Sequence, residues 1–308
     1  MVRLRMLETF DQQRLENSGR GAMGAALEAG KIIHFPVCPI ELASNKDLEL
    51  LRRELPQQIK LKNISYHPEA GSIRGIEKGS PVTELLTNLL VNHSNRVSDF
   101  LRAQLPGLFD HALVGTCSFR PLEERGRNLK PHASNELMHI DAGAYGATNG
   151  DRILRFFVNV NTTQDRVWAS RGTFPELLQR YGDKAGLNNV TARSLHKSPL
   201  DKMRSGILNF IDQIGAPVSR ALDSSPYDRA MRKFHNFMKD TPEFQSNPEG
   251  LIAIRFAPMS AWMVLTDMVS HACLEGQHCL NYTALVPLQD CQRPELAPYN
   301  ILAKKNSA

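Results

Sequence analysis

The chain has 308 residues, of which 42% are hydrophobic, and a formal net charge of +5 at pH 7. This length and apolar content predict one folded domain with a sizeable core, and they exclude a disordered or fibrous chain. The modest positive charge favours an anionic partner. No basic run is interleaved with aromatic residues, so nucleic acid is not an expected partner.

Cysteine and hydropathy patterns favour a cytoplasmic protein. The five cysteines are odd in number and form no C-x-x-C pair, which argues against a disulfide framework and a zinc ribbon. No segment reaches the roughly 18 apolar residues of a membrane span. The opening stretch MVRLRMLETFDQQRLE lacks the apolar core of a signal peptide.

The N-terminal part, residues 1–110, is predicted to be a mostly helical support. KIIHFP (31–36) has the pattern of a short strand that ends at a proline. ASNKDLELLRREL (43–55) begins with capping residues and continues in helix formers. Residues 81–107 place leucines near helical spacing before a terminal Pro-Gly, so a long helix is expected there.

Beyond residue 110 the apolar period changes from that of a helix to that of a strand. The candidate strands are residues 112–121, 136–142, 153–161, 166–170, 251–258, 261–267, 268–274 and 279–287. They form two groups, 111–172 and 250–288, separated by a helical insertion at 173–249. Two groups of four strands predict an α+β, mainly β fold: a cupin-like double-stranded β-helix, or jelly roll, in one domain over 1–308.

The strongest chemical signal is the pair His139 and Asp141. Residues two apart on a strand point to the same side, so this imidazole and carboxylate can hold one metal ion. A jelly roll brings late strands beside early ones, and His271 is therefore the expected third ligand, with His278 as its rival. Two histidines and one carboxylate leave adjacent positions open for a bidentate ligand and O₂.

Other histidines have a weaker pattern. His67 and Glu69 form an H-x-E pair, but the proline between them predicts a loop. The remaining histidines are expected on the surface or packed in the structure: His93, His111, His132, His196 and His235.

Strand parity separates residues 153–161 into two faces. One face, expected to pack on helices, consists of Leu154, Phe156, Val158 and Val160. The other face is mixed in polarity, which suits the wall of a cavity that holds a polar ligand, and it carries Arg155 and Phe157. Arg152 belongs to the apolar-face side.

Two further arginines, Arg120 and Arg255, are expected at the same cavity. An inward guanidinium needs a carboxylate or phosphate partner, because an unpaired buried charge costs several kcal/mol. Three such arginines therefore predict an anionic ligand. Trp168 and Trp262 are expected in the core, with stacking on a sugar ring as the alternative.

Several stretches resemble one family, the Kdo 3-hydroxylases. They are KNISYHPEAGSIRG, the run from HASNELMHIDAG through GDRILRFFVNVN to RVWASRG, and DMVSHACLEG. The likeness is strongest over about 60–172 and 250–288. Members of this family are Fe(II)- and 2-oxoglutarate-dependent dioxygenases that act on 3-deoxy-D-manno-oct-2-ulosonic acid (Kdo) in Gram-negative lipopolysaccharide.

The resemblance implies a role for each candidate site residue. His139, Asp141 and His271 become the iron ligands. Arg155 becomes the leading anchor for the far carboxylate of 2-oxoglutarate, and Arg120 a second contact to the cosubstrate or the sugar acid. Many relatives in the wider superfamily carry this anchor about ten residues beyond the last histidine, where this chain reads QHCLNY, so Arg255 and Arg152 stay open as anchors.

The resemblance also implies the reaction: hydroxylation of C3 of Kdo in Kdo-lipid A to give Ko, with Fe(II), 2-oxoglutarate and O₂. Three alternatives stay open: an oxygenase on another anionic sugar or lipid, a zinc hydrolase, and a non-catalytic sugar-binding jelly roll. Within the insertion, residues 226–239 predict a core-packed helix with a basic face. That helix or the basic N-terminus could also dock on anionic lipid at the cytoplasmic membrane.

Overall fold

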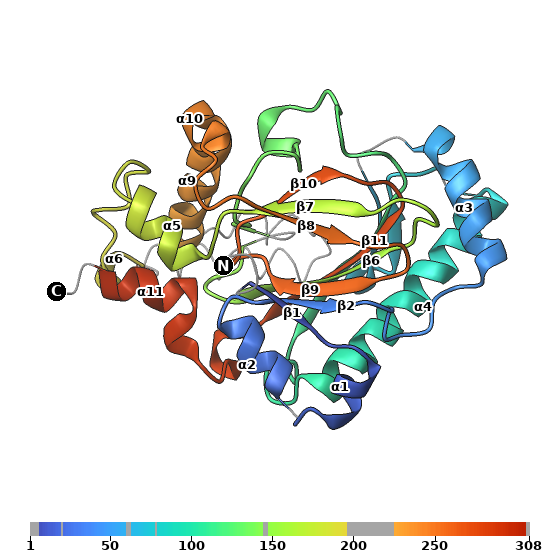
Figure 1. Cartoon of the computed structure of the whole chain (residues 1–308), viewed down its shortest axis with the longest axis horizontal. Helices are drawn as coiled ribbons and strands as arrows, with labels where there is room; N and C mark the ends of the chain where they lie inside the picture. The colour runs from blue at the N-terminus through green and yellow to red at the C-terminus, as the bar shows by residue number, and fades with distance from the viewer. Residues whose placement is uncertain are drawn as a thin grey trace.

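The computed structural model describes residues 6–19, 21–59, 63–77, 79–143, 147–195 and 225–305. The part of the predicted insertion at 196–224, with His196, and the first five residues lie outside this range. Two β-sheets form the centre of the molecule (Figure 1). Their strands are β1 (Leu7–Thr9), β2 (Ile32–Phe35), β3 (Ile64–His67), β4 (Ser72–Arg74), β5 (Leu113–Arg120), β6 (Arg152–Asn159), β7 (Arg166–Ser170), β8 (Ile252–Phe256), β9 (Ala261–Leu265), β10 (Ala272–Glu275) and β11 (Cys279–Val286).

Helices gather at opposite ends of the sheets (Figure 1). They are α1 (Gln12–Asn17), α2 (Ala22–Glu28), α3 (Asn45–Gln58), α4 (Pro81–Gln104), α5 (Phe174–Tyr181), α6 (Ala192–Leu195), α9 (Pro226–Asp240), α10 (Pro242–Ser246) and α11 (Pro298–Lys305). Helices α3 and α4 lie at one end, and the insertion helices α5, α9 and α10 lie at the other. Within the described residues, no helix is both long and apolar enough to cross a membrane.

The strand order is that of two stacked sheets. The large sheet has the order β1-β2-β9-β6-β11-β5-β3-β4, and the small sheet has the order β10-β7-β8. Neighbouring strands are antiparallel except for β1 and β2. This arrangement, with flanking helices, confirms the predicted jelly-roll-like α+β fold.

The two groups of predicted strands correspond to the structure except at 136–142 and in the first part of 268–274, where β10 begins only at Ala272. Residues 136–142 were expected to form a strand, but they form a single isolated bridge between His139 and His271. The N-terminal part also contributes more strands than the one expected, because β1, β3 and β4 join the large sheet. These strands have only three or four residues, too few to show a clear period in the sequence.

The two faces of β6 pack as their parity predicts. On the first face, the Phe156 ring lies 5.9 Å from that of Phe100 on α4. On the second face, the Phe157 ring contacts Trp168 of β7 and Trp262 of β9, with centroid distances of 4.9 and 5.1 Å. The second face therefore looks into the space between the two sheets.

Helix α9 of the insertion is a core helix. It begins at Pro226 after a capping box in which Ser225 and Asp228 bond each other's backbone N–H. Its apolar stripe is buried, as predicted, and consists of Tyr227, Ala230, Met231, Phe234 and Met238. Asp228 also accepts hydrogen bonds from the backbone N–H and the hydroxyl of Thr148, so the helix is tied to the loop before β6.

A buried ion pair fixes the segment that leads to His271. Nε of Arg152 lies 2.5 Å from Oδ2 of Asp267, and both side chains are almost completely buried. Oδ1 of Asp267 accepts the N–H of Ile153 at 3.2 Å. Arg152 therefore lies on the apolar-face side of β6, as predicted, and its partner there is Asp267 and not a bound ligand.

Removal of this pair's acidic member should strongly destabilise the chain. Asp267→Ala leaves a buried guanidinium without a counter-charge, and we expect the free energy of unfolding to fall by about 3–5 kcal/mol. Urea denaturation followed by circular dichroism measures this change. As a control, Asp183→Ala breaks an exposed pair with Lys305 and should cost less than about 1 kcal/mol. Equal losses in the two variants would contradict the structural role of the buried pair.

Candidate metal centre

Two segments that are far apart in the sequence pair to create the candidate site. The N–H of His139 donates to the carbonyl of His271 at 3.1 Å, and the N–H of His271 donates back at 2.8 Å. Two residues further on, the N–H of Asp141 donates to the carbonyl of Thr266 at 2.9 Å. The backbone therefore holds the early and late ligand candidates side by side.

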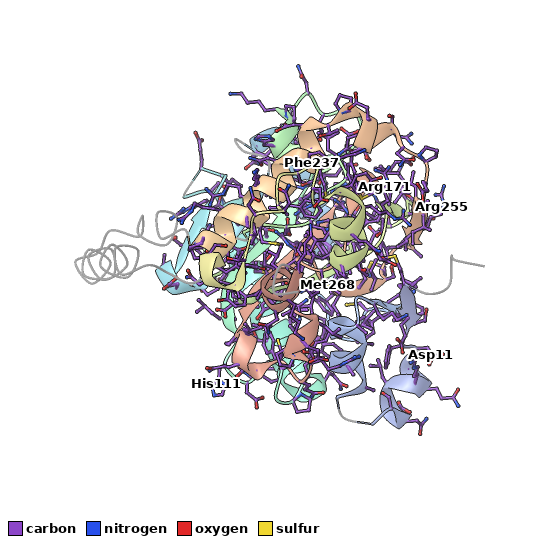
Figure 2. All side chains as sticks on the ribbon, turned by 90° about the vertical axis from the view of Figure 1, so that its left-hand side faces the viewer. Asp11, His111, Arg171, Phe237, Arg255 and Met268 are labelled. Atoms are coloured by element: carbon purple, nitrogen blue, oxygen red, sulfur yellow. The ribbon has the colours of Figure 1, made fainter. Side chains whose placement is uncertain are left out.

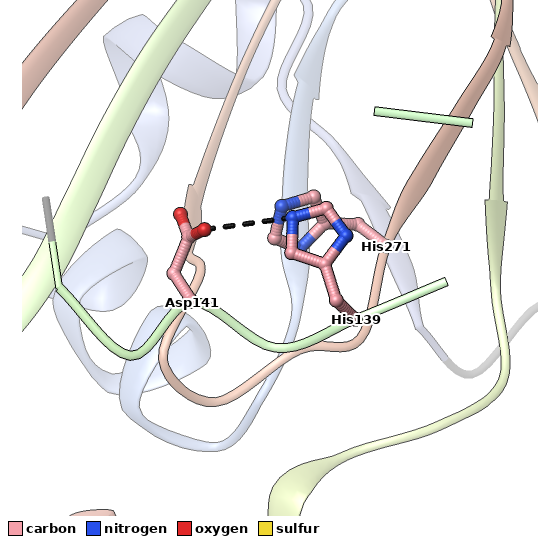
Figure 3. A group of neighbouring side chains, drawn as sticks. All are labelled: His139, Asp141 and His271. Carbon is pink, nitrogen blue, oxygen red and sulfur yellow. Dashed lines mark ion pairs between the residues drawn. The ribbon is translucent and has the colours of Figure 1, made fainter. Parts of the chain in front are cut away.

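The side chains of His139, Asp141 and His271 converge at this pairing (Figure 3). Their potential ligand atoms lie within 4.8 Å of one another, and all three residues are buried. Nε2 of His139 is 3.6 Å from Oδ1 of Asp141, and the two imidazole centroids are 4.5 Å apart. Within the part of the chain that the structure describes, no other group of His, Cys, Asp or Glu comes together in this way.

Both imidazoles have their tautomer set by the backbone two residues earlier. Nδ1 of His139 lies 2.7 Å from the carbonyl oxygen of Leu137, and Nδ1 of His271 lies 3.0 Å from that of Val269. A carbonyl only accepts hydrogen bonds, so each Nδ1 carries the proton. Each Nε2 is therefore left as a lone-pair donor that faces the common centre, which is the arrangement that metal-binding histidines use.

The charge states also suit a metal ion. Burial lowers the pKa of His139 and His271, so both imidazoles are neutral at pH 7. Burial alone would raise the pKa of Asp141, but the Arg155 guanidinium holds it well below its usual range. Two neutral nitrogens and one carboxylate form a two-histidine, one-carboxylate set that suits Fe(II).

A cavity opens beside this group, between the two sheets. Its volume is about 40 Å³, and the free space reaches about 320 Å³ when the opening to solvent is included. Besides the three candidate ligands it is lined by Arg120, Asn135, Arg155, Phe157, Trp168 and Cys273. Trp168 stacks on the ring of His271 at 5.3 Å, so this residue belongs to the core and to the cavity wall at once. Trp262 lies fully in the core, as predicted.

Two of the three predicted arginines lie in the cavity. Nε of Arg155 lies 2.9 Å from Oδ2 of Asp141, an ion pair that lacks hydrogen-bond geometry. Nε of Arg120 is buried and has no hydrogen-bond partner. The cavity thus contains two guanidiniums: that of Arg155 has Asp141 as its counter-charge, whereas the Nε–H of Arg120 has no hydrogen-bond partner. An unmet buried donor of this kind calls for an anionic ligand.

The Glu124 carboxylate is shared by several arginines beside the cavity. Oε1 of Glu124 lies 3.0 Å from Arg166 and 3.6 Å from Arg120, and Oε2 lies 3.8 Å from Arg127. Both Glu124 oxygens also accept from the side-chain amide of Asn135. Burial and the neighbouring Arg166 lower the pKa of Arg120 more than Glu124 raises it. Three guanidiniums around this one carboxylate make the local charge balance positive.

The expectation that Arg255 faces this cavity is wrong. Its side chain is 66% exposed and lies 3.7 Å from Asp165, at the edge of the molecule (Figure 2). Strand β8 is the edge strand of the small sheet, and only its apolar face is buried. His278, the rival ligand, does not belong to the converging group. His67 stays on β3 in the large sheet, where its Nε2 contacts Ser65.

Sequence reasoning missed several residues of the site. Asn135 and Cys273 line the cavity. Because Cys273 is two residues beyond His271, strand parity could have placed its side chain on the same side as that of His271. His235 was expected to be a surface or packed histidine, yet its ring lies 5.1 Å from that of His139. No local pattern marks His235, because it reaches the site from helix α9.

Comparison with known proteins gives a family and a set of solved relatives. The sequence profile described as 3-deoxy-D-manno-oct-2-ulosonic acid (Kdo) hydroxylase matches residues 11–307. Among solved structures, the apo form of the Kdo hydroxylase KdoO has 26% sequence identity and a TM-score of 0.75, and the alignment covers 96% of this chain and 94% of that chain. None of the curated protein sequences matches significantly.

Two ligand-bound forms of KdoO match equally well. One is a complex with alphaketoglutarate, that is 2-oxoglutarate, and Fe(III), and the other is a complex with succinate and Fe(III). Each has 26% identity, a TM-score of 0.74 and the same coverage of both chains. All three structures are described as those of a non-heme Fe(II) alphaketoglutarate dependent dioxygenase.

The three converging residues predict a site with a defined pH response. Co(II), as a spectroscopic substitute for Fe(II), should bind with constant affinity above pH 6.5 and lose affinity at lower pH, where the imidazoles take up protons. Asp141→Ala should reduce affinity by more than the roughly 10- to 100-fold typical of changes outside the ligand set. His278→Ala serves as the control. Wild-type binding by Asp141→Ala, or equal losses in both variants, would contradict the site.

Proposed function

This chain belongs to the Kdo hydroxylase family, and from that premise we propose that it hydroxylates C3 of Kdo in Kdo-lipid A to give Ko. The enzyme is an Fe(II)- and 2-oxoglutarate-dependent dioxygenase. The observation that carries the proposal is the convergence of His139, Asp141 and His271 beside a cavity with two inward arginines. A sugar acid and a dicarboxylate are both anions, as those arginines require.

The residues fit the metal that this chemistry needs. His139, Asp141 and His271 would hold Fe(II), because their ligand atoms are close together, buried and in the correct protonation state. When bound, Fe(II) and 2-oxoglutarate supply O₂ activation, in which one oxygen atom enters the C–H bond and the other enters the succinate formed with CO₂. The chain's own part is to bind, orient and shield the reactants.

We assign the far carboxylate of 2-oxoglutarate to Arg120. Arg155 is already paired with Asp141, so its charge orients a metal ligand. Arg120 has an unmet Nε–H, and its acidic neighbour Glu124 is shared with Arg166 and Arg127. This differs from the sequence expectation, in which Arg155 was the leading anchor. Arg155 remains close enough to the centre to contact the other end of the cosubstrate.

Aromatic side chains limit the access of water to the cavity. The rings of Phe157 and Trp168 pack against each other and line the cavity wall. The guanidinium of Arg120 lies 5.9 Å from the Phe157 ring, which holds it over an apolar surface. Such a site keeps the arginine charge poorly solvated until an anion arrives.

The substrate proposal includes contact with a membrane surface. Lipid A carries acyl chains, and Arg232 and Lys233 lie exposed on α9. The apolar stripe of α9 is buried in the core, so any such contact is electrostatic and does not involve insertion of this helix.

The direct test of the proposed function is coupled turnover. With Fe(II), 2-oxoglutarate and O₂, purified enzyme should release succinate in a Kdo-lipid A-dependent manner and yield one equivalent of hydroxylated Kdo by mass spectrometry. Kdo-lipid A in anionic vesicles and in detergent micelles separates membrane presentation from chemistry. The proposal would be contradicted if hydrolytic products formed without O₂, or if the rate of succinate release did not depend on Kdo-lipid A.

Substitution of Arg120 tests the cosubstrate assignment. Arg120→Met should raise the KM for 2-oxoglutarate about 10- to 100-fold, because a hydrogen bond to a charged group contributes about 1.5–3 kcal/mol. Arg255→Met is the matched control and should leave this KM unchanged. A larger change in this KM in Arg155→Met than in Arg120→Met would contradict the assignment and identify Arg155 as the anchor.

A further inference from the structure

Among the described residues, the metal-ligand segment 135–141 has main-chain hydrogen-bond partners on one side only. The carbonyl of Asn135 accepts from Cys273, His139 pairs with His271, and Asp141 donates to Thr266. These are odd-numbered residues, whose backbone groups point toward the late segment 266–273. On either side of the isolated bridge at His139, Met138 and Ile140 point their backbone groups to the opposite edge, as alternate residues of paired chains do. On that edge the described part of the chain supplies no neighbouring strand.

Side chains from the insertion occupy that open edge. The amide of Gln245 binds both backbone groups of Met138: its Oε1 accepts the N–H at 2.9 Å, and its Nε2 donates to the C=O at 3.0 Å. Nδ1 of His235 lies 2.8 Å from the carbonyl oxygen of Ile140 and must be the donor. The even-numbered residues Met138 and Ile140 thus receive from two side chains the hydrogen bonds that a neighbouring strand would give.

Helices α9 and α10 of the insertion are held in place by further hydrogen bonds, so Gln245 and His235 have defined positions. The same Gln245 amide donates to the carbonyl of Met238, which connects α10 to α9. The guanidinium of Arg171, just after β7, donates to the carbonyls of Phe244, Gln245 and Asn247.

A third side chain of the insertion, Lys239 of α9, extends the same contact. Nζ of Lys239 donates to the carbonyls of His132 and Ser134, at 3.2 and 2.8 Å. Gln245, His235 and Lys239 of the insertion therefore lie along the segment 132–140, and each binds its main-chain atoms. Main-chain contacts fix the path of the backbone whatever side chains it carries.

We propose that helices α9 and α10 replace the missing neighbouring strand and set the positions of His139 and Asp141. Gln245 and His235 are positioning residues, since they act on the ligands through Met138 and Ile140. The inference rests on the proposed function, because it assumes that the converging group holds Fe(II). It gives the insertion a role in metal binding, in addition to its place in the core.

The test compares variants that lose or keep the bonding groups. Gln245→Leu removes both bonds to Met138, whereas His235→Leu removes the donor to Ile140 and His235→Gln keeps one. Glu243→Gln, at an exposed position on α10, is the matched control. For each purified chain we would measure Co(II) affinity, the melting temperature of the metal-free form, amide exchange over 135–141 and the ratio of succinate to hydroxylated product.

We expect Gln245→Leu and His235→Leu to weaken Co(II) binding about 10- to 100-fold, the usual effect of losing an outer-shell partner. Amide exchange at Met138 should accelerate in Gln245→Leu, and succinate should exceed hydroxylated product in both variants. His235→Gln should recover most of the affinity that His235→Leu loses.

Two results would overturn the inference. One is Co(II) affinity in folded Gln245→Leu and His235→Leu equal to that of Glu243→Gln. The other is a fall in melting temperature with unchanged affinity and coupling, which would make both residues purely structural. If Gln245→Leu fails to fold, the His235 pair decides the question by itself. Failure of the wild-type chain to bind Co(II) or Fe(II) would instead refute the proposed function.

Discussion

The reciprocal backbone pairing of His139 and His271 is the constraint on which the rest of the site depends. It joins a loop before β6 to the loop before β10, and it brings two imidazoles with matching tautomers to one point. The bond from Asp141 to Thr266 then fixes the carboxylate on the same side. Because the neighbouring Asp267 is bound by the buried Arg152, the late loop is anchored in the core. A rigid backbone thus prepares the ligand set before any metal arrives.

Charge explains why the cavity suits acids. Arg120, Arg127 and Arg166 surround one carboxylate, Glu124, while Arg155 faces Asp141. A buried excess of cations is costly unless an anion joins it. A dicarboxylate cosubstrate and a sugar acid both meet this need, and a neutral sugar does not. The same electrostatic constraint therefore links metal binding, cosubstrate binding and the choice of an acidic substrate.

Much of the fold and of the site follows from local patterns in the sequence. Parity correctly separated Phe156 from Arg155 and Phe157, because β6 is a central strand with different neighbours on its two faces. Parity failed for Arg255 because it shows which residues share a face and not which face is buried. On edge strand β8 the apolar face packs against the core, and the Arg255 side chain on the other face is exposed to solvent.

The strand expected at 136–142 is absent for a different physical reason. Residues 136–142 contain bends at 136, 137 and 142, so they make only the single bridge from His139 to His271. On the other edge, side chains of Gln245 and His235 bond the backbone of Met138 and Ile140. A contact between a helix side chain and a distant backbone group leaves no periodic signal. Our proposal of Arg120 in place of Arg155 as the cosubstrate anchor likewise rests on which guanidinium is already paired, a property of the folded site alone.

Anaerobic titration of the purified chain with Fe(II) and then 2-oxoglutarate tests the central claim most directly. If the three residues hold iron with adjacent positions open, one equivalent of each should produce the visible charge-transfer band of a chelated 2-oxo acid, and His271→Ala should abolish it. A chain that binds zinc tightly and shows no such band, or a full band in His271→Ala, would contradict the account.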